Sequence, residues 1–491
     1  MLKDSESIDF DVVIVGAGIS GINFAYRLQQ HNPDLSYCIL EGRHEIGGTW
    51  SLFQYPGIRS DSDLFTFGFS WRPWTGKQSI ANGPLILDYV KECAKQEGID
   101  KKIRYSHFVN SMHWSSSSKT WAVTVTTGDA EKTERTLQTR FVFMGTGYYD
   151  YDEPLKVDIP GIQDFKGTVI HPQFWPSDLD YTDKRMVIIG SGATAITILP
   201  SVAAETAHVT MLQRSPSYVM SLPAEGTFET VTRKALPRGV AHSLIRFKWI
   251  LTSFMLVSFC RKFPNAARNF FLRTIAKQLP EGTAMDPDFT PSYNPWEQRV
   301  CMCPDGDFYK ALESGKASIK TGAIEKVTES SIRLTTGEEL HTDIIVTATG
   351  LKMKMGGGIN IYVDGERYDL SQHYLWKFAM AEDLPNVAFA WGYVDASWTL
   401  GADATSQLTC RLLNRMKERR VQAVVPRLHP HLRSNMKDLS IMALSATYVK
   451  KGQASCPKVG NLAPWQPRSH YWKDILTAWW GDLEDGMEWI Q

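Results

Sequence analysis

The sequence of 491 residues carries no excess of charge of either sign, with 53 Lys and Arg residues against 53 Asp and Glu residues. Proteins that bind nucleic acids through phosphate contacts have a marked basic excess, so this balance argues against a nucleic-acid partner. The composition also excludes a disordered or collagen-like chain, because 43% of the residues are hydrophobic and 22% are charged. One hydrophobic core stops growing near ~250–300 residues, so the length predicts two or three domains.

Paired cysteines and clustered metal ligands are also missing. The seven cysteines are scattered and include no CxxC pair, which indicates a reduced, cytoplasmic protein. We interpret Cys301 and Cys303 as alternate positions of one strand. His429 and His431 lie in a basic loop without further ligands, so no metal site is expected.

A signal peptide and a long apolar run are absent too. Residues 1–10 are polar and acidic, without the apolar core of a secretory signal. The longest apolar run, residues 249–260, would measure about 18 Å as a helix, short of the ~30 Å of a membrane core. We expect a buried helix here and no stable membrane span. Its basic flanks leave peripheral membrane contact as the alternative; they are Arg246, Lys248, Arg261 and Lys262.

Aromatic residues, in contrast, are plentiful. The chain has 16 Trp, 18 Tyr and 22 Phe, or 11% of its residues. Such a composition suits large planar ligands or interior cavities, although it establishes neither.

The first informative motif follows a short β-branched strand at residues 11–15. GAGISG comes next, and a segment with helical apolar spacing follows it. In such a turn the first glycine makes the bend, the second lets the backbone approach a pyrophosphate, and the third lets the helix pack on the strand. A second strand, residues 37–40, ends at Glu41, where a ribose hydroxyl needs an acceptor. The predicted dinucleotide-binding residues are Gly16, Gly18, Ser20, Gly21 and Glu41.

The same order of elements recurs from residue 186. Strand 186–189 leads into the turn GSGATA, then into a predicted helix over 196–205 and a strand over 208–213. Here the residue after the second strand is Arg214, which can pair with a 2′-phosphate, so NADPH is favoured over NADH. The alternative for Arg214 is an ordinary solvated surface arginine. The predicted binding residues are Gly190, Ser191, Gly192, Ala193, Thr194, Ala195, Arg214 and Ser215.

Between the two motifs the sequence FKGTVIHPQFWP resembles the FxGxxxHxxxWP motif of the type I Baeyer–Villiger monooxygenases at every fixed position. Its motif residues are Phe165, Gly167, His171, Trp175 and Pro176. Residues 47–63, 293–299 and 346–350 are similar to the subgroup of that family that activates ethionamide. The likeness extends from about residue 10 to about residue 415 and is less clear over the last ~75 residues.

The resemblance implies FAD at the first motif, NADPH at the second, and a ketone or sulfide substrate with O2. It implies that Asp61 lies beside the flavin and orients a catalytic arginine, for which Arg299 is the matching position. Gln298 stands where better-studied relatives have a lysine. It further implies that His171 is a linker residue and carries no proton. Beyond the two motifs, the expected cofactor contacts are Gly48, Thr49, Trp50, Arg59, Ser60, Asp61 and Val109.

We therefore predict an α/β protein with two Rossmann-like dinucleotide-binding domains, one inserted in the other. The FAD-binding domain takes residues 1–150 and 338–491, with the strand in 344–349 beside the flavin. The NADPH-binding domain takes residues 151–337, with a helical insertion at about 216–290. Residues Ser397 to Thr399 could line a substrate pocket or pack in the core.

The predicted activity is an NADPH- and O2-dependent conversion of ketones to esters or lactones through a C4a-peroxyflavin, with sulfides and thioamides as further substrates. Two alternatives remain open. One is an N- or S-oxygenating flavin-containing monooxygenase, and the other is an NADPH-dependent flavin reductase of a protein or disulfide partner. The missing CxxC pair argues against the reductase.

Overall fold

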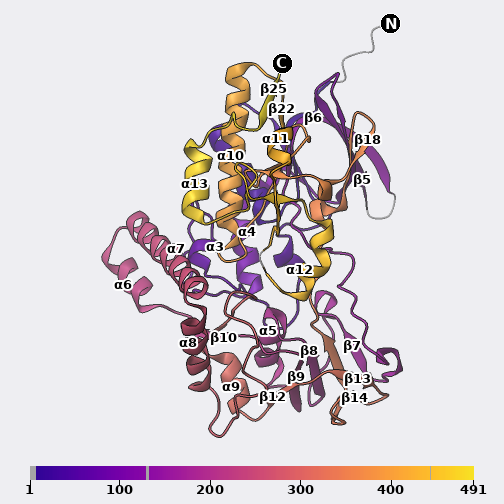
Figure 1. The fold of residues 1–491 in the computed structure, drawn as a ribbon, viewed down its shortest axis with the longest axis vertical. Coiled ribbons are helices and arrows are strands. Elements are labelled where there is room, and N and C mark those ends of the chain that lie inside the picture. Colours follow the sequence, from indigo (N-terminus) through magenta and orange to yellow (C-terminus); the bar gives the residue numbers. More distant parts are fainter. Residues whose placement is uncertain (1–6, 129–131, 443) are drawn as a thin grey trace.

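The structure is a computed structural model that describes residues 7–128, 132–442 and 444–491. Residues 1–6, where no secretory signal is expected, lie outside the described residues. The fold has two halves, each built on its own twisted sheet (Figure 1). The first sheet and the C-terminal helices fill the upper half of the view, and the second sheet fills the lower half.

The first half is organised around a nine-stranded sheet. Its centre is parallel, because β1 pairs with β2 on one side and β6 on the other, β3 follows β2, and β21 also pairs with β6. The remaining strands extend the sheet beyond β6. The strands are β1 (Phe10–Val15), β2 (Tyr37–Leu40), β3 (Ile103–Arg104), β4 (His107–Ser115), β5 (Thr120–Thr127), β6 (Thr133–Met144), β17 (Asn360–Val363), β18 (Glu366–Tyr368) and β21 (Val387–Phe389).

The second half contains a five-stranded sheet in the order β12-β9-β8-β16-β7, with parallel pairing throughout. A three-stranded antiparallel sheet of β13, β14 and β15 accompanies it. The bounds are β7 (Thr168–Ile170), β8 (Arg185–Ile189), β9 (His208–Gln213), β12 (Ala317–Thr321), β13 (Ile324–Val327), β14 (Ser331–Leu334), β15 (Glu339–His341) and β16 (Ile344–Thr347).

The strand at 344–347 corrects one expectation. We expected the first domain to resume at residue 338 and to include this strand, but β16 pairs with β8 and β7 in the second sheet. A short β-branched run identifies a buried strand and carries no information about its neighbours. The chain therefore returns to the first sheet only at β17.

Helices cover both sheets and connect them. They are α1 (Ile19–His31), α2 (Thr49–Leu52), α3 (Leu64–Phe67), α4 (Gly83–Gln96), α5 (Ala193–Val202), α6 (Thr227–Ala235), α7 (Arg238–Lys262), α8 (Pro264–Ala276), α9 (Asp307–Glu313), α10 (Trp398–Arg419), α11 (Pro430–Arg433), α12 (Thr447–Gly452) and α13 (Tyr471–Trp480). Helix α5 ends at Val202, three residues before the end predicted from the sequence.

Four two-stranded sheets complete the described fold. They pair β10 (Val219–Leu222) with β11 (Cys301–Pro304), β19 (Leu375–Trp376) with β20 (Met380–Ala381), β22 (Ala423–Pro426) with β25 (Met487–Ile490), and β23 (Asp438–Leu439) with β24 (Val459–Gly460). Cys301 and Cys303 are alternate buried residues of β11, as predicted.

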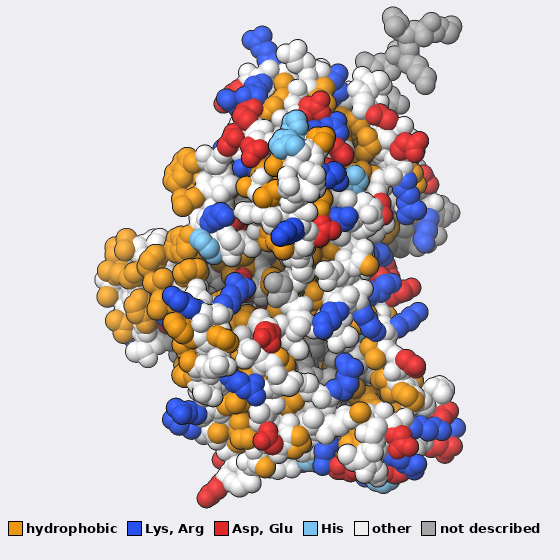
Figure 2. Space-filling view, viewed as in Figure 1, with side chains coloured by type: hydrophobic (Ala, Val, Ile, Leu, Met, Phe, Trp, Pro, Cys, Tyr) orange, Lys and Arg blue, Asp and Glu red, His pale blue; other side chains and the backbone are white. Residues whose placement is uncertain are grey.

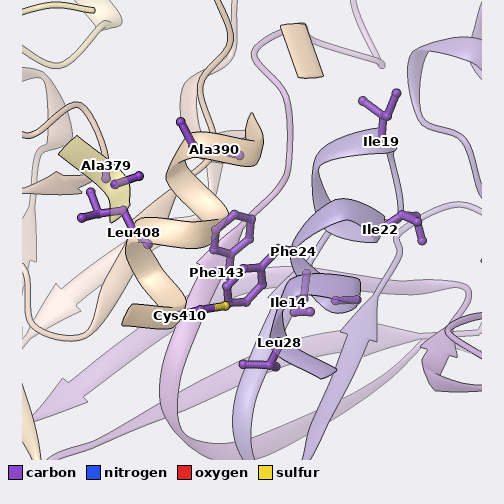
Figure 3. Packing of buried hydrophobic residues seen from close by; sticks show 14 of the residues in the cluster. Ile14, Ile19, Ile22, Phe24, Leu28, Phe143, Ala379, Ala390, Leu408 and Cys410 are labelled. Atoms are coloured by element: carbon purple, nitrogen blue, oxygen red, sulfur yellow. The ribbon is translucent and has the colours of Figure 1, made fainter. Parts of the chain in front are cut away.

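The main core lies between the first sheet and the two helices α1 and α10 (Figure 3). Phe24 from α1 stacks on Phe143 from β6 with ring centroids 3.7 Å apart. Leu408 and Cys410 from α10 close the other side. This packing fixes α1, and with it the glycine turn at its N-terminus.

Helix α7 differs from the expected buried helix. It is the one described helix long and apolar enough to cross a membrane, yet only 28% of its apolar stretch is buried. Figure 1 shows α6 and α7 projecting to the left of the body. Because α7 packs by one side only, its opposite side is exposed.

Candidate active site

The turn between β1 and α1 leaves space and hydrogen-bond donors for a phosphate. Gly16 has a φ of +99°, and a Cβ there would lie 2.7 Å from the carbonyl oxygen of Gly145. Gly18 begins α1 and no side chain caps the helix, so its first amides are available to an anion. A Cβ on Gly18 would meet only Gly48, at 3.8 Å, so this side of the turn is open. These features fit the pyrophosphate of FAD.

Glu41, at the end of β2, shapes the sugar end of the same site. The side chain is 7% exposed, and both its oxygens accept backbone hydrogen bonds, from Ala17 at 2.8 Å and from Arg43 at 3.0 Å. Burial raises the pKa of Glu41, while these two hydrogen bonds oppose the change. The carboxylate is thereby held in one position at the cavity wall, as an acceptor for ribose hydroxyls requires.

The second glycine turn, between β8 and α5, repeats this arrangement. Gly192 begins α5 without a side-chain cap, and a Cβ there would meet nothing within 4 Å. Ser191 donates a hydrogen bond to the carbonyl oxygen of Ser215, 2.9 Å away, and so joins the turn to the end of β9. Arg214 lines the cavity and is exposed. Within the described chain it forms no ion pair, so its guanidinium is free to bind an anionic group.

Both turns open into one cavity of about 990 Å³, at the upper end of the ~300–1,000 Å³ usual for ligand sites. All but two of the predicted cofactor-binding residues line it, Val109 and Ser60 included. The exceptions, Gly21 and Ala195, are buried behind the turns. A Cβ on Gly21 would lie 1.9 Å from the carbonyl oxygen of Gly16, so close helix packing explains this glycine.

Arg299 and Asp61 form an ion pair inside the cavity. Asp61 comes from the loop after α2, and Arg299 lies 238 residues later, just before β11. Both side chains remain accessible, at 37% and 45% exposure. Asp61 raises the pKa of Arg299 above its already high ordinary value, and this effect exceeds the opposing effect of burial. The arginine is therefore a permanent cation.

Three tyrosines surround this cation. Tyr148, Tyr149 and Tyr448 all interact electrostatically with Arg299 and line the cavity. Burial raises the pKa of each phenol, so all three hydroxyls stay protonated at neutral pH. The hydroxyls of Tyr148 and Tyr149 are 2.9 Å apart and form a hydrogen bond. The site thus combines one fixed positive charge with neutral hydrogen-bond donors.

Aromatic rings form the apolar part of the wall. Trp398, at the start of α10, stacks on Tyr148 and donates a hydrogen bond to Ser20, 2.9 Å away. Trp50 packs edge-on against Phe67, and both line the cavity. Trp398 thus connects Ser20, in the first glycine turn, to Tyr148, which interacts with Arg299. Its neighbours Ser397 and Thr399 are buried and do not line the cavity.

Arg59 lines the cavity and also joins two parts of the chain that are far apart in sequence. It forms an ion pair with Asp307, the first residue of α9. The arginine side chain is only 9% exposed. Arg59 therefore connects the loop of Asp61 to the second half of the molecule.

None of the five motif residues lines the cavity. Phe165 is buried among β-strand residues of the second half, and a Cβ on Gly167 would lie 2.3 Å from the carbonyl oxygen of Asp343. His171 Nδ1 accepts a hydrogen bond from the backbone of Gln173, and burial lowers the pKa of His171. Trp175 packs edge-on against Tyr181. These contacts, with Pro176 next in the chain, support a structural role for the motif.

Sequence reasoning missed the three tyrosines and the C-terminal wall. Tyr148 and Tyr149 follow β6 after three intervening residues, and the carboxyl ends of parallel strands are where such folds bind ligands, so their position could have identified them. Tyr448 and Lys451, from α12, line the cavity as well. Nothing in their local sequence marks them, because they reach the site only through the tertiary fold.

Two family models match this chain. A family model described as flavin-binding monooxygenase-like matches residues 79–236. A second, described as an NAD(P)-binding Rossmann-like domain, matches residues 14–78.

Similar relatives cover nearly the whole chain. The FAD-containing monooxygenase EthA of Mycolicibacterium smegmatis is 46% identical over 467 residues, 95% of this chain and 94% of that protein. EthA of Mycobacterium tuberculosis is 44% identical, covering 97% of this chain and 96% of that one. The probable FAD-binding monooxygenase AlmA of Acinetobacter baylyi is 43% identical, covering 97% of this chain and 95% of that protein.

Solved structures show the same fold at low identity. An open structure of cyclohexanone monooxygenase has a TM-score of 0.75 at 18% identity, covering 99% of this chain and 100% of that one. A steroid monooxygenase bound to NADP has a TM-score of 0.73 at 18% identity, covering 98% and 99%. OTEMO, in a complex with FAD and NADP, has a TM-score of 0.72 at 19% identity, covering 99% and 100%. With a relative 46% identical over almost the full length, the chain belongs to the family of FAD-containing monooxygenases, with FAD as its cofactor and a second site for a nicotinamide dinucleotide.

Proposed function

We propose that the protein uses NADPH and O2 to convert ketones to esters or lactones, and that it also oxygenates sulfides and thioamides. The observation that carries this proposal is the Arg299–Asp61 ion pair, which lies in the cavity that both glycine turns line. A permanent cation at this point is the feature that ketone oxygenation needs and that simple electron transfer does not.

The residues of the first turn and Glu41 would hold FAD, which when bound supplies hydride acceptance and the activation of O2. The open turn at Gly18 and the uncapped start of α1 would bind its phosphates. Glu41 would accept a hydrogen bond from its ribose.

Arg299 would stabilise negative charge that develops on the reacting oxygen. A preorganised charge acts strongly, because it needs no reorganisation during the reaction. Asp61 fixes the direction of the guanidinium, and the protonated hydroxyls of Tyr148 and Tyr448 can donate to the same oxygen. The protein would thus hold one positive charge and several hydrogen-bond donors around the reacting oxygen.

Arg214 supports NADPH as the electron donor. It is an exposed, unpaired cation among the described residues at the end of β9, and a guanidinium binds a phosphate through two parallel hydrogen bonds. An acidic residue at this point would favour NADH.

The aromatic wall supports an apolar substrate. Trp50, Phe67 and Trp398 line the same cavity as Arg299, and none of them carries a charge. The neighbouring structures include cyclohexanone monooxygenase with bound ε-caprolactone. We therefore propose cyclic and long-chain apolar ketones as first candidates.

A ketone and sulfide panel tests the proposal. NADPH consumption should rise when a ketone is added, with ester or lactone formed in proportion. Arg299→Ala should abolish ketone oxygenation, whereas Arg367→Ala, at an exposed arginine of β18, should leave it unchanged. Sulfide oxidation that survives in Arg299→Ala, without ketone products in the parent enzyme, would instead identify an N- or S-oxygenase.

We also propose that the protein works in the cytoplasm. The seven cysteines are all free and buried, a state that suits a reducing compartment. Fractionation of cells that express the chain should recover it in the intracellular fraction, within the space that the cytoplasmic membrane encloses. Recovery in a secreted fraction would contradict this location.

A further inference from the structure

The helices α6, α7 and α8 carry most of the exposed apolar surface of the described molecule. Of its twenty exposed large hydrophobic side chains, eleven lie in residues 227–277. Figure 2 shows the apolar side chains gathered on the part that projects to the left, over α6 and α7. The eleven are Phe228, Val231, Leu236, Val240, Leu244, Phe247, Phe254, Met255, Phe259, Phe263 and Phe270.

Helix α7 is apolar on two opposite faces. One face, which includes Ile245, Ile250 and Val257, packs against the protein. The other, which runs from Val240 through Leu244 and Phe247 to Met255 and Phe259, is exposed and follows the helical repeat. The inner face of α7 already packs against the rest of the protein. A second apolar stripe on its outer face therefore indicates that this face also contacts an apolar environment.

The same segment is strongly basic. Residues 227–277 contain ten Lys and Arg and one acidic residue, Glu229, although the whole chain has no net charge. Glu229 is 3% exposed and is paired with Lys248. The exposed charges of α6–α8 are therefore all positive.

Several of these cations are free and lie beside the apolar stripe. Lys234, Arg238 and Lys262, at the ends of α6 and α7, are exposed and form no ion pair among the described residues. On α8 a shallow hollow is lined by Ala266, Asn269, Phe270, Arg273, Thr274 and Lys277. Two further cations, Arg273 and Lys277, line this hollow together with the exposed ring of Phe270. Apolar side chains edged by unpaired cations are the pattern of segments that bind anionic lipid surfaces.

We propose that α6, α7 and α8 bind the surface of an anionic lipid bilayer, with α7 lying in the interface and its outer stripe among the acyl chains. A spanning orientation does not fit. Arg246, in the middle of α7, is buried and donates hydrogen bonds to the carbonyl oxygens of Phe65, 3.0 Å away, and Gly68, 2.9 Å away. These bonds hold the helix against α3.

A second copy of the chain fits this surface less well than a bilayer. In a symmetric contact the same patch meets itself, so two uniformly positive surfaces would face each other. Anionic headgroups instead neutralise the charge while the acyl chains receive the apolar stripe.

The bound helix would also lie next to the active site. Trp249 of α7 packs against Phe65 of α3, with ring centroids 5.9 Å apart, and Phe67 of the same short helix lines the cavity. Lipid contact would therefore bring the cavity close to a pool of apolar molecules.

Vesicle sedimentation with the FAD-loaded enzyme tests the proposal. We expect it to sediment with vesicles of phosphatidylcholine and phosphatidylglycerol at low salt, and not with phosphatidylcholine alone or at high salt. Val240→Gln with Met255→Gln alters the two most exposed side chains of the stripe and should weaken binding at least tenfold. Lys234→Gln with Arg238→Gln and Lys262→Gln should weaken it about tenfold to a hundredfold.

Matched controls separate this surface from the rest of the molecule. Leu439→Gln alters an exposed apolar side chain of β23, and Lys184→Gln with Lys310→Gln and Lys437→Gln removes three exposed lysines elsewhere. Both controls should bind like the parent, and all variants should keep the NADPH oxidation rate measured without vesicles. No binding to the anionic vesicles would overturn the proposal. So would equal binding by test and control variants, or a concentration-dependent dimer that Val240→Gln/Met255→Gln dissolves in place of vesicle binding.

Discussion

Asp61 and Arg299 lie 238 residues apart in the chain and meet as an ion pair in the wall of a single cavity. Asp61 belongs to the loop between α2 and α3, and Arg299 to the segment that leads into β11. The pair therefore lies in the same cavity as the two glycine turns.

Removing the cation should stop oxygen transfer and spare electron transfer. We expect Arg299→Ala to reduce ketone oxygenation by at least about a hundredfold, the loss typical of one preorganised stabilising group. Bleaching of the FAD absorbance by NADPH without oxygen should stay within a few-fold of the parent rate. A variant that still makes ester at the parent rate would exclude the assigned role.

Asp61→Asn tests the partner separately. The amide keeps the size of the side chain but removes the charge that orients Arg299, so a smaller loss of product is expected, with NADPH consumed and H2O2 released. Asp152→Asn, at an exposed carboxylate that lines the cavity and pairs with Lys354, is the matched control. The ratio of product to NADPH measures the effect, and an unchanged ratio in Asp61→Asn would argue against orientation by this carboxylate.

Arg214 should decide between the two nicotinamide nucleotides. We expect Arg214→Ala to raise the KM for NADPH about tenfold or more, since a charge-assisted hydrogen bond contributes about 1.5–3 kcal/mol. The KM for NADH, which has no 2′-phosphate, should change little. Lys184→Ala, an exposed cation just before β8, serves as control. Equal changes with both nucleotides would show that Arg214 does not contact the phosphate.

Glu41→Gln should weaken FAD binding. Both oxygens of Glu41 accept backbone N–H bonds, and the amide nitrogen of glutamine would face one of these donors without accepting from it. An unmet buried donor costs about 1–3 kcal/mol, so the FAD dissociation constant should rise about tenfold. Glu134→Gln, at an exposed position of β6, should have no effect. FAD content after dialysis is the measurement, and full retention by Glu41→Gln would contradict this role.

The buried ion pair of Arg27 and Asp403 should contribute to the free energy of unfolding. Arg27 of α1 and Asp403 of α10 bond at 2.7 Å, and both are almost fully buried. Burial opposes ionisation of Asp403, but the charge and hydrogen bonds of Arg27 outweigh it, and its pKa lies below the usual value. A carboxylate with a lowered pKa stabilises the fold above its unfolded pKa of about 3.9, and this contribution is lost as the pH falls through the lower folded pKa.

Asp403→Ala leaves the arginine buried and unpaired and should cost about 3–5 kcal/mol in denaturant unfolding at neutral pH. The difference from the parent should shrink below about pH 4 as Asp403 takes up a proton. Asp34→Ala, in the loop after α1, removes a carboxylate that pairs with Lys417 of α10 at the surface, and it should cost under about 1 kcal/mol. Equal losses in the two variants would show that burial of the pair is unimportant.

Most of the expected cofactor-binding residues could be found from the sequence, because each glycine turn is a local feature of the chain. Each turn, with its strand before it and helix after it, is recognisable within about thirty residues, and both occur where expected. The Arg299–Asp61 pair was expected from the family resemblance alone, since no local pattern joins residues so far apart.

What escaped prediction depends on the tertiary fold. Strand β16 was assigned to the wrong sheet, because strand neighbours are decided by the whole topology. Helix α7 was expected to be buried, with peripheral membrane contact as the alternative, because an apolar run by itself does not show which of its faces stays outside. Tyr448 reaches Arg299 from the last part of the chain, where the resemblance was weakest.

One measurement tests the central claim most directly: incubation of the FAD-loaded enzyme with NADPH, cyclohexanone and ¹⁸O2, followed by mass spectrometry of the product. The account predicts a lactone that carries one ¹⁸O atom, formed by the parent and not by Arg299→Ala. NADPH consumption with unlabelled ketone and all the ¹⁸O in hydrogen peroxide or water, under conditions where FAD is bound and a range of ketones has been tried, would contradict it.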